Sequence, residues 1–275
     1  MRVILLTALT MIAFAANSVL NRMAIETGGI DPAGFALIRV AAGAAMLVVL
    51  LRLQGRKMTL ATPRRLIGAG ALTLYMIGFS LAYLTLDAGL GALILFGVVQ
   101  ITMFVVSAAR GIWPSPRQLA GAMVAFGGLL WVLWPGENAV ADPAGALLMV
   151  LAGIGWGFYT LAGKAEPDAL AGTAANFVVC LPLVALLPVL TGLAEMAPLG
   201  VALAVISGAV TSGMGYALWY SVLPKLEAAV AATVQLSVPV IALAGGVLFL
   251  GETLSLRFLL GGALVLGGIA LTLRR

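Results

Sequence analysis

The sequence contains no histidine and a single cysteine, Cys180, and only 9% of its residues are charged. The lack of histidine excludes an HExxH zinc site, a Ser-His-Asp triad and a Cys-His nucleophile. A lone cysteine cannot form an intrachain disulfide. No Walker A sequence is present, which argues against direct use of ATP. We therefore expect no enzymatic activity, no metal and no cofactor.

The scarcity of charge indicates a membrane protein. A soluble domain carries roughly 25% charged residues, whereas this chain of 275 residues is 63% hydrophobic and has a mean hydropathy of +1.16. Apolar runs of about 20 residues are long enough to cross a hydrocarbon core. The sequence predicts an all-α polytopic membrane protein with ten transmembrane helices, near residues 3–21, 32–51, 66–84, 88–108, 117–134, 143–162, 170–190, 198–220, 228–249 and 257–273.

The basic residues are distributed unevenly over the predicted loops. If the N-terminus lies inside, Arg22 and Arg257 fall outside and Arg39 falls within a span. The other twelve of the 15 fall inside: Arg2, Arg52, Arg56, Lys57, Arg64, Arg65, Arg110, Arg117, Lys164, Lys225, Arg274 and Arg275. The positive-inside rule therefore predicts an N-in, C-in topology. It also accounts for the pI of about 9.8, so we expect the lipid bilayer, and no nucleic acid, as a partner.

The N-terminus has two interpretations. Arg2, the apolar stretch 3–11 and the small residues around Phe14 resemble a cleavable signal peptide. A retained first helix is favoured, because cleavage would leave nine spans and spoil the charge pattern.

The chain repeats itself at an offset of 140 residues. Gly68-Ala69 matches Gly208-Ala209, Arg117 matches Arg257, and Asp87 matches the acid Glu227. This predicts two five-helix repeats, residues 1–138 and 139–275. Because five is odd, the second repeat must be inverted relative to the first. Inverted repeats in a membrane indicate a secondary transporter whose site lies between them.

Several motifs add a family resemblance. Trp156-Gly157 running to Lys164, Gly251-Glu252 in the run 250–254, and the glycine pairs at 261–262 and 267–268 resemble the EamA-type, ten-helix branch of the drug/metabolite transporter superfamily. Within that branch the chain is similar to bacterial amino-acid exporters such as the aromatic amino-acid exporters of the YddG type. The first half departs from the pattern, because Phe14-Ala15 replaces Trp-Gly and no acid follows Gly111.

Uncharged polar and aromatic residues inside the spans are the candidate substrate-binding residues. Tyr and Trp offer an apolar wall with one polar group. The candidates are Asn17, Tyr75, Tyr83, Gln100, Trp156, Tyr159, Tyr216, Trp219 and Gln235. The alternative is that the amides bridge helices and the aromatics form interfacial belts. Pro182 and Pro239 interrupt backbone hydrogen bonds within spans and are candidate hinges or kinks.

Charged residues near or inside the spans leave two alternatives open. Arg39 lies within the second span, where it either attracts a substrate carboxylate or extends outward to the helix end. Asp87, Glu227 and Glu252 stand at short turns, where capping of helix N-termini is favoured over proton coupling.

Together these features predict a secondary, non-ATP transporter that exports a small neutral or zwitterionic metabolite by alternating access. Export rests on the family resemblance. Amino acids, aromatic ones among them, are the favoured substrates. The alternatives are an exporter of drugs or other metabolites and a non-transporting membrane scaffold. We expect a wet central pocket, a multi-pass location in the bacterial inner membrane, and a monomer or homodimer.

Overall fold

The computed structural model describes residues 2–60, 62–86, 88–133, 142–192, 196–250 and 256–273, and every regular element in these ranges is helical. The helices of the first part of the chain are α1 (Arg2–Glu26), α2 (Pro32–Leu53), α3 (Pro63–Ala82), α4 (Ala88–Ala109) and α5 (Pro116–Leu133). Those of the second part are α6 (Pro143–Lys164), α7 (Ala169–Thr191), α8 (Pro198–Ile206), η1 (Ser207–Met214), α9 (Gly215–Val222), η2 (Leu223–Lys225), α10 (Ala228–Val234), α11 (Ser237–Leu250) and α12 (Leu256–Leu273).

Several helices start at an acidic or hydroxyl cap. Asp31 accepts hydrogen bonds from the backbone of Ala33 and Gly34, and the capping residues Thr62, Asp142 and Asp168 do the same for α3, α6 and α7. Proline follows three of these caps, where its missing N–H costs nothing.

The predicted capping role of Glu227 is wrong. Its side chain makes no cap bond to α10 and instead accepts a hydrogen bond from Gln118. The amide of Gln118 is therefore the partner that satisfies this carboxylate. Asp87, Glu252 and the side chain of Arg257 lie outside the described residues.

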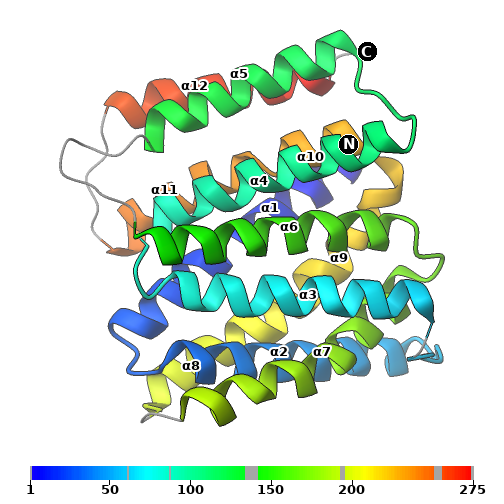
Figure 1. Ribbon diagram of the computed structural model, residues 1–275, viewed down its shortest axis with the longest axis vertical. Helices are drawn as coiled ribbons and strands as arrows, with labels where there is room; N and C mark the ends of the chain where they lie inside the picture. Colours follow the sequence, from blue (N-terminus) through cyan, green and yellow to red (C-terminus); the bar gives the residue numbers. More distant parts are fainter. Residues whose placement is uncertain are drawn as a thin grey trace.

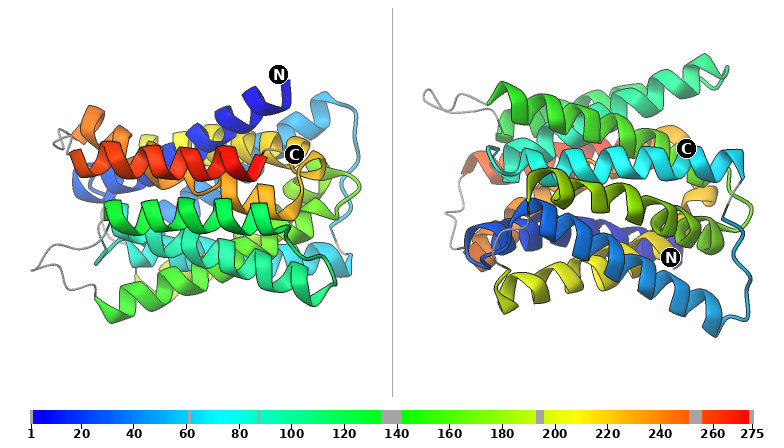
Figure 2. Two further views of the ribbon diagram at one scale, coloured as in Figure 1. Left: turned by 90° about the horizontal axis from the view of Figure 1, so that it is seen from above. Right: turned by 60° about the horizontal axis from the view of Figure 1, so that its bottom comes forward.

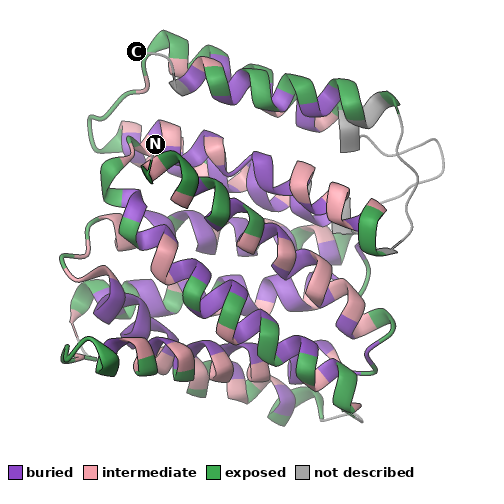
Figure 3. Ribbon diagram, turned by 180° about the vertical axis from the view of Figure 1, so that it is seen from behind, coloured by how far each residue is buried: buried purple, intermediate pink, exposed green. Residues whose placement is uncertain are grey.

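The surface is apolar, as a lipid-facing surface must be. Within the described residues, seven stretches are long and apolar enough to cross a membrane by length and composition: Arg2–Glu26, Pro32–Leu53, Pro63–Ala82, Pro143–Lys164, Ala169–Thr191, Pro198–Lys225 and Ala228–Phe249. Ile94–Ala109 and Leu259–Thr272 are shorter apolar helices. Large apolar side chains such as Leu190 and Leu248 are exposed along the outer helices, while buried positions gather in the middle of the bundle (Figure 3). The chain is thus a polytopic membrane protein.

Corresponding helices of the two parts of the chain pack in corresponding ways. α3 packs on α6 and α4 on α6, while α1 packs on α8, η1, α9 and α11. α2 packs on α7, and α5 packs on α12 (Figure 1). The start of α1 and the end of α12 lie at the same end of the bundle (Figure 1). This packing is what the predicted inverted repeat requires, although the repeat and its orientation remain predictions.

Glycines set the distance between α5 and α12, which lie side by side at one edge of the bundle (Figure 2). A Cβ on Gly121 would lie 2.6 Å from the carbonyl oxygen of Gly268, and a Cβ on Gly268 would lie 2.5 Å from that of Gly121. The two backbones therefore approach as closely as only glycine permits. A Cβ on Gly127 or Gly267 would meet nothing within 4 Å. In the adjacent pairs 127–128 and 267–268, only Gly128 and Gly268 therefore allow the close approach of the two helices.

Two predicted spans are not regular α-helices. In the eighth span the π-helix η1 separates α8 from α9. The ninth span is interrupted at Gln235-Leu236, between α10 and α11, four residues before Pro239. Pro239 has no N–H to bond the carbonyl of Gln235, which instead accepts from the N–H of Val238 at 3.0 Å. By contrast, α7 continues through Pro182 and Pro188 without interruption.

Candidate functional site

Aromatic rings from α1, α3, α6 and α9 form one cluster in the middle of the bundle. Trp156 is its hub, with ring centroids 5.3 Å from Phe14, 4.9 Å from Tyr75 and 4.9 Å from Tyr216. Phe79 extends the cluster toward Tyr83, and Tyr159 extends it toward Tyr220. All of these side chains are buried. Rings contributed by both parts of the chain therefore share one interior surface.

A buried polar network runs beside the rings. The Arg39 Nε donates to Ser212 Oγ at 2.9 Å, and Ser212 Oγ in turn donates to Asn17 Oδ1 at 3.3 Å. Asn17 Oδ1 also accepts from Ser207 Oγ at 2.7 Å and Thr211 Oγ1 at 2.5 Å. The Arg39 Nη2 donates to the hydroxyls of Tyr75 and Tyr216, each at 3.3 Å. The guanidinium thereby joins the polar network to the aromatic cluster.

The π-helix η1 supplies three of these hydroxyls. Ser207, Thr211 and Ser212 all face Asn17 from this one segment. A π-helical turn is costly and is found mostly at functional sites. A Cβ on Gly208 would lie 2.3 Å from the backbone oxygen of Arg39, so this glycine lets η1 approach α2. The close packing of η1 on α2 therefore places the hydroxyls within reach of the guanidinium.

The aromatic rings leave little free space between them. A cavity of about 10 Å³ lies between Phe14, Asn17, Ser18, Tyr75, Phe79, Leu95, Phe96, Trp156 and Tyr216. That is room for about one water molecule. The expected wet central pocket is therefore wrong for this part of the described chain, because the rings fill the space themselves.

Most of the predicted site residues meet here. Asn17, Tyr75, Trp156 and Tyr216 line the small cavity. Tyr83, Tyr159 and Trp219 touch the cluster through neighbouring rings, and Gln235 accepts a hydrogen bond from Trp156 Nε1 at 2.6 Å.

Gln100 is the exception among the predicted site residues. It is buried, but no described contact joins it to the cluster, and its amide oxygen has no partner among the described residues.

Arg39 is the residue that the sequence reasoning left out of the site. The expected alternative, an outward-reaching side chain, is wrong, because Arg39 is 0% exposed. The helical position alone does not show which way the side chain turns. Two of the three hydroxyls that it contacts, those of Ser212 and Tyr216, lie more than 170 positions away in the sequence.

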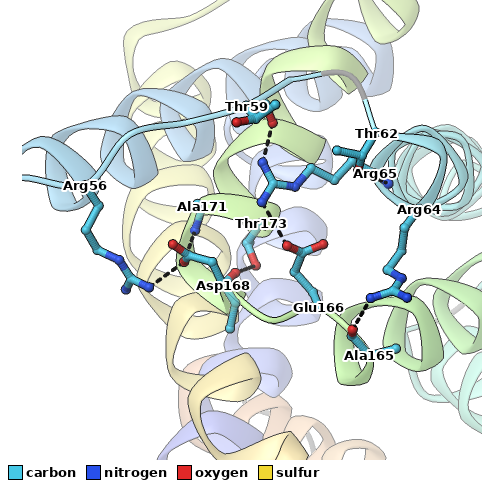
Figure 4. A network of polar contacts seen from close by, with 11 residues as sticks. Arg56, Thr59, Thr62, Arg64, Arg65, Ala165, Glu166, Asp168, Ala171 and Thr173 are labelled. Carbon is cyan, nitrogen blue, oxygen red and sulfur yellow. Dashed lines mark hydrogen bonds and ion pairs between the residues drawn. The ribbon is translucent and has the colours of Figure 1, made fainter.

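A second polar network closes one end of the bundle. Arg65 pairs with Glu166 at 2.8 Å and Arg56 pairs with Asp168 at 2.6 Å. Arg64 donates to the carbonyl of Ala165, and Arg65 donates to the carbonyl of Thr59 (Figure 4). These contacts tie the segment between α2 and α3 to the segment between α6 and α7. The ends of these helices are thus held together by charge.

Comparison with known proteins relates the second part of the chain to a family of transporters. An uncharacterized protein of Pseudomonas aeruginosa is 49% identical over 275 residues, which cover 99% of this chain and 94% of that protein. Residues 143–274 match the EamA-like transporter family. The second part of the chain therefore resembles the EamA-like transporter family. An uncharacterized transporter of Archaeoglobus fulgidus is 30% identical over 168 residues, 58% of each chain.

A solved structure shares the fold. A crystal structure superposes with a TM-score of 0.82 at 17% identity and covers 99% of this chain and 97% of that chain. The family that residues 143–274 match is one of membrane transporters of small molecules, within the drug/metabolite transporter superfamily.

Proposed function

We propose that this protein is a secondary transporter that exports a neutral or zwitterionic metabolite, most of all amino acids, across the bacterial inner membrane. The observation that carries the proposal is the central cluster of aromatic rings and amide or hydroxyl groups. Rings suit an apolar side chain, while amides and hydroxyls suit an ammonium and a carboxylate. Aromatic amino acids match this lining best.

Alternating access is the mechanism that fits the packing. Ligand pockets are usually about 300–1,000 Å³, whereas the central cavity is about 10 Å³. A substrate therefore enters only when helices of the two proposed repeats separate. The matching contacts of α3 with α6 and of α1 with η1 and α9 support an inverted pair of five-helix units that rearrange in this way.

The break in the ninth span supports a moving element near the site. Gln235 ends α10, and its side chain holds Trp156, while Pro239 lies in the first turn of α11. We propose that α11 tilts at this break, and that Pro182 in the continuous α7 is a static bend.

The test is counterflow into liposomes that contain the purified protein. Vesicles loaded with unlabelled phenylalanine, tryptophan, threonine or alanine are given the labelled form of the same amino acid outside. We expect exchange of the aromatic amino acids to be fastest. Lack of exchange with all four, in protein whose buried Cys180 remains protected from thiol reagents, would refute the amino-acid proposal.

A non-transporting scaffold also predicts close packing of Asn17 and Trp156. The match of residues 143–274 to a transporter family disfavours that alternative. Replacement of Trp156 by alanine separates the two proposals, because it removes the hub of the cluster. A transporter should lose exchange, whereas a scaffold has no exchange to lose.

A further inference from the structure

Arg39 is a buried cation, and none of its contacts among the described residues is a carboxylate. Its side chain is fully buried, and its three hydrogen bonds all go to neutral hydroxyls, of Ser212, Tyr75 and Tyr216. Its Nη1 has no partner among the described residues. Burial of an ion costs several kcal/mol unless a charged partner compensates it. The described chain does not provide that compensation.

The described carboxylates are all engaged elsewhere. Glu166 and Asp168 pair with Arg65 and Arg56 at one end of the bundle. Of the others, Glu26 pairs with Arg22, Glu227 accepts from Gln118, and Asp31 and Asp142 cap α2 and α6. Each of these groups lies at or beyond a helix end, so none is available to the interior.

Aromatic faces compensate part of the charge. The guanidinium carbon lies 5.7 Å from the centroid of Tyr75 and 5.2 Å from that of Phe79. Cation–π attraction of a desolvated arginine is worth about 2 kcal/mol. That is less than a carboxylate in bidentate contact supplies, so the site favours an added anion.

Arg39 also adjoins the central cavity. Tyr75 and Tyr216 accept its hydrogen bonds and line the cavity, and Phe79 lines it as well. A ligand that moves these rings aside reaches Nη1 and Nη2 directly. Two parallel N–H groups match the two oxygens of one carboxylate.

We propose that Arg39 binds the carboxylate of the transported substrate, and that the substrate is therefore a monocarboxylate. The carboxylate takes Nη1 and Nη2, and the hydroxyls of Tyr75 and Tyr216 turn to donate to the same group. Ser212 and Asn17 hold Nε in place. This inference rests on the proposed transport function and adds the chemical group that the site selects.

The decisive experiment compares phenylalanine with one analogue that lacks the carboxylate and one that keeps the carboxylate but lacks the ammonium. Phenylalanine, phenylalaninamide and 3-phenylpropanoate are tested as inhibitors of phenylalanine counterflow and, separately, for slowing thermal exposure of Cys180 in purified protein. Loss of one partner of a buried charge pair weakens binding by about 100-fold. We expect both carboxylates to act at concentrations about 100-fold lower than phenylalaninamide. Equal potency of the amide in the wild type would overturn the proposal.

Two variants assign the effect to Arg39. Arg39→Gln should reduce the preference for carboxylate over carboxamide to within about 3-fold, because the amide side chain carries no charge. Arg39→Lys keeps the charge but loses the bidentate geometry, and should retain a weaker preference. Arg65→Lys, in the network at the end of the bundle, serves as the matched control and should keep the full preference. A folded Arg39→Gln protein that still prefers carboxylates would refute the assignment.

The two measurements separate this inference from the proposed function. Protection of Cys180 by 3-phenylpropanoate without any amino-acid counterflow would support the carboxylate site and refute amino-acid transport. Counterflow of phenylalanine without any preference for carboxylates would support amino-acid transport and refute the carboxylate site.

Discussion

Arg65 and Arg39 are both largely buried, but the chain surrounds them differently. Arg65 is 9% exposed and pairs with Glu166, which is 11% exposed. Arg39 is more deeply buried and contacts only hydroxyls and ring faces. A charge that the chain neutralises itself holds two segments together. A charge left without a carboxylate is costly to the fold and retains the capacity to bind an anion.

The greatest loss of stability is expected when Glu166 is replaced. Glu166→Gln leaves the guanidinium of Arg65 without its counter-ion, which should cost about 3 kcal/mol and lower the Tm by roughly 6–12 °C. Arg39→Met should change stability by less than about 1 kcal/mol, since an apolar side chain replaces an uncompensated ion. The Tm of both variants can be measured from the reaction of Cys180 with a thiol-reactive dye on heating, because this single cysteine is buried in the folded protein.

Asp168→Asn is the matched control for Glu166→Gln. Its ion pair with Arg56 is 40% and 33% exposed, so the loss should stay below about 1 kcal/mol. Asparagine also retains the cap of α7 on Ala171. If Arg39→Met proves more destabilising than Glu166→Gln, Arg39 is a structural residue, and the contrast drawn between Arg39 and Arg65 is wrong.

A smaller loss of stability is expected at the contact between α2 and η1. A Cβ on Gly208 would lie 2.3 Å from the backbone oxygen of Arg39 and 2.8 Å from the Cβ of Ala42. Gly208→Ala should therefore push the helices apart at a cost of roughly 1–3 kcal/mol. Gly127→Ala adds a methyl group where nothing lies within 4 Å and should not destabilise. Equal Tm values for the two variants would show that η1 and α2 have room to separate.

Sequence alone predicted much of this fold. Apolar runs indicated where helices lie, since each span must satisfy its own backbone in lipid. Asp31-Pro32 and Asp142-Pro143 mark helix starts by local chemistry. Phe14 and Asn17 are three residues apart in α1, as are Trp156 and Tyr159 in α6, so each pair shares a helix face, and these residues meet in the cluster.

The rest depended on contacts between distant segments. Nothing local marks Ser207–Met214 as a π-helix, because its geometry follows from packing on α2 and α1. The inward direction of Arg39 depends on hydroxyls near residues 212 and 216. The cavity was expected to be open, but the number of rings that share one volume is a tertiary property. Conversely, Gln100 is a buried amide in a predicted span, as a substrate-binding residue would be, yet no described contact joins it to the cluster.

A smaller effect concerns the hydrogen bond between Trp156 and Gln235. Trp156→Phe keeps a ring beside Phe14 and Tyr75 but removes the donor to the buried Gln235 Oε1. An unsatisfied buried acceptor costs about 1–2 kcal/mol. Trp219→Phe is the control, because Trp219 Nε1 has no partner among the described residues. A larger loss of Tm in Trp219→Phe would contradict this ranking.

The smallest effect tests a charge at the end of the bundle. The backbone N–H of Gly145 and the hydroxyl of Thr85 donate to Asp142 and hold the pKa of its carboxyl below the usual value. A carboxyl whose pKa is lower in the folded protein than in the unfolded chain stabilises the fold above the unfolded pKa, about 3.9 for Asp. That stabilisation is lost as the pH falls through the folded pKa. Thr85→Val removes one donor, so its Tm should lie slightly below that of the wild type at neutral pH, and the two curves should converge once the pH falls below the folded pKa of Asp142. A Tm difference that stays constant with pH would mean that Thr85 acts through packing.

The central network should show no such titration, because the described residues place no carboxylate beside Arg39. The rate of amino-acid exchange should accordingly be constant between about pH 5 and 8.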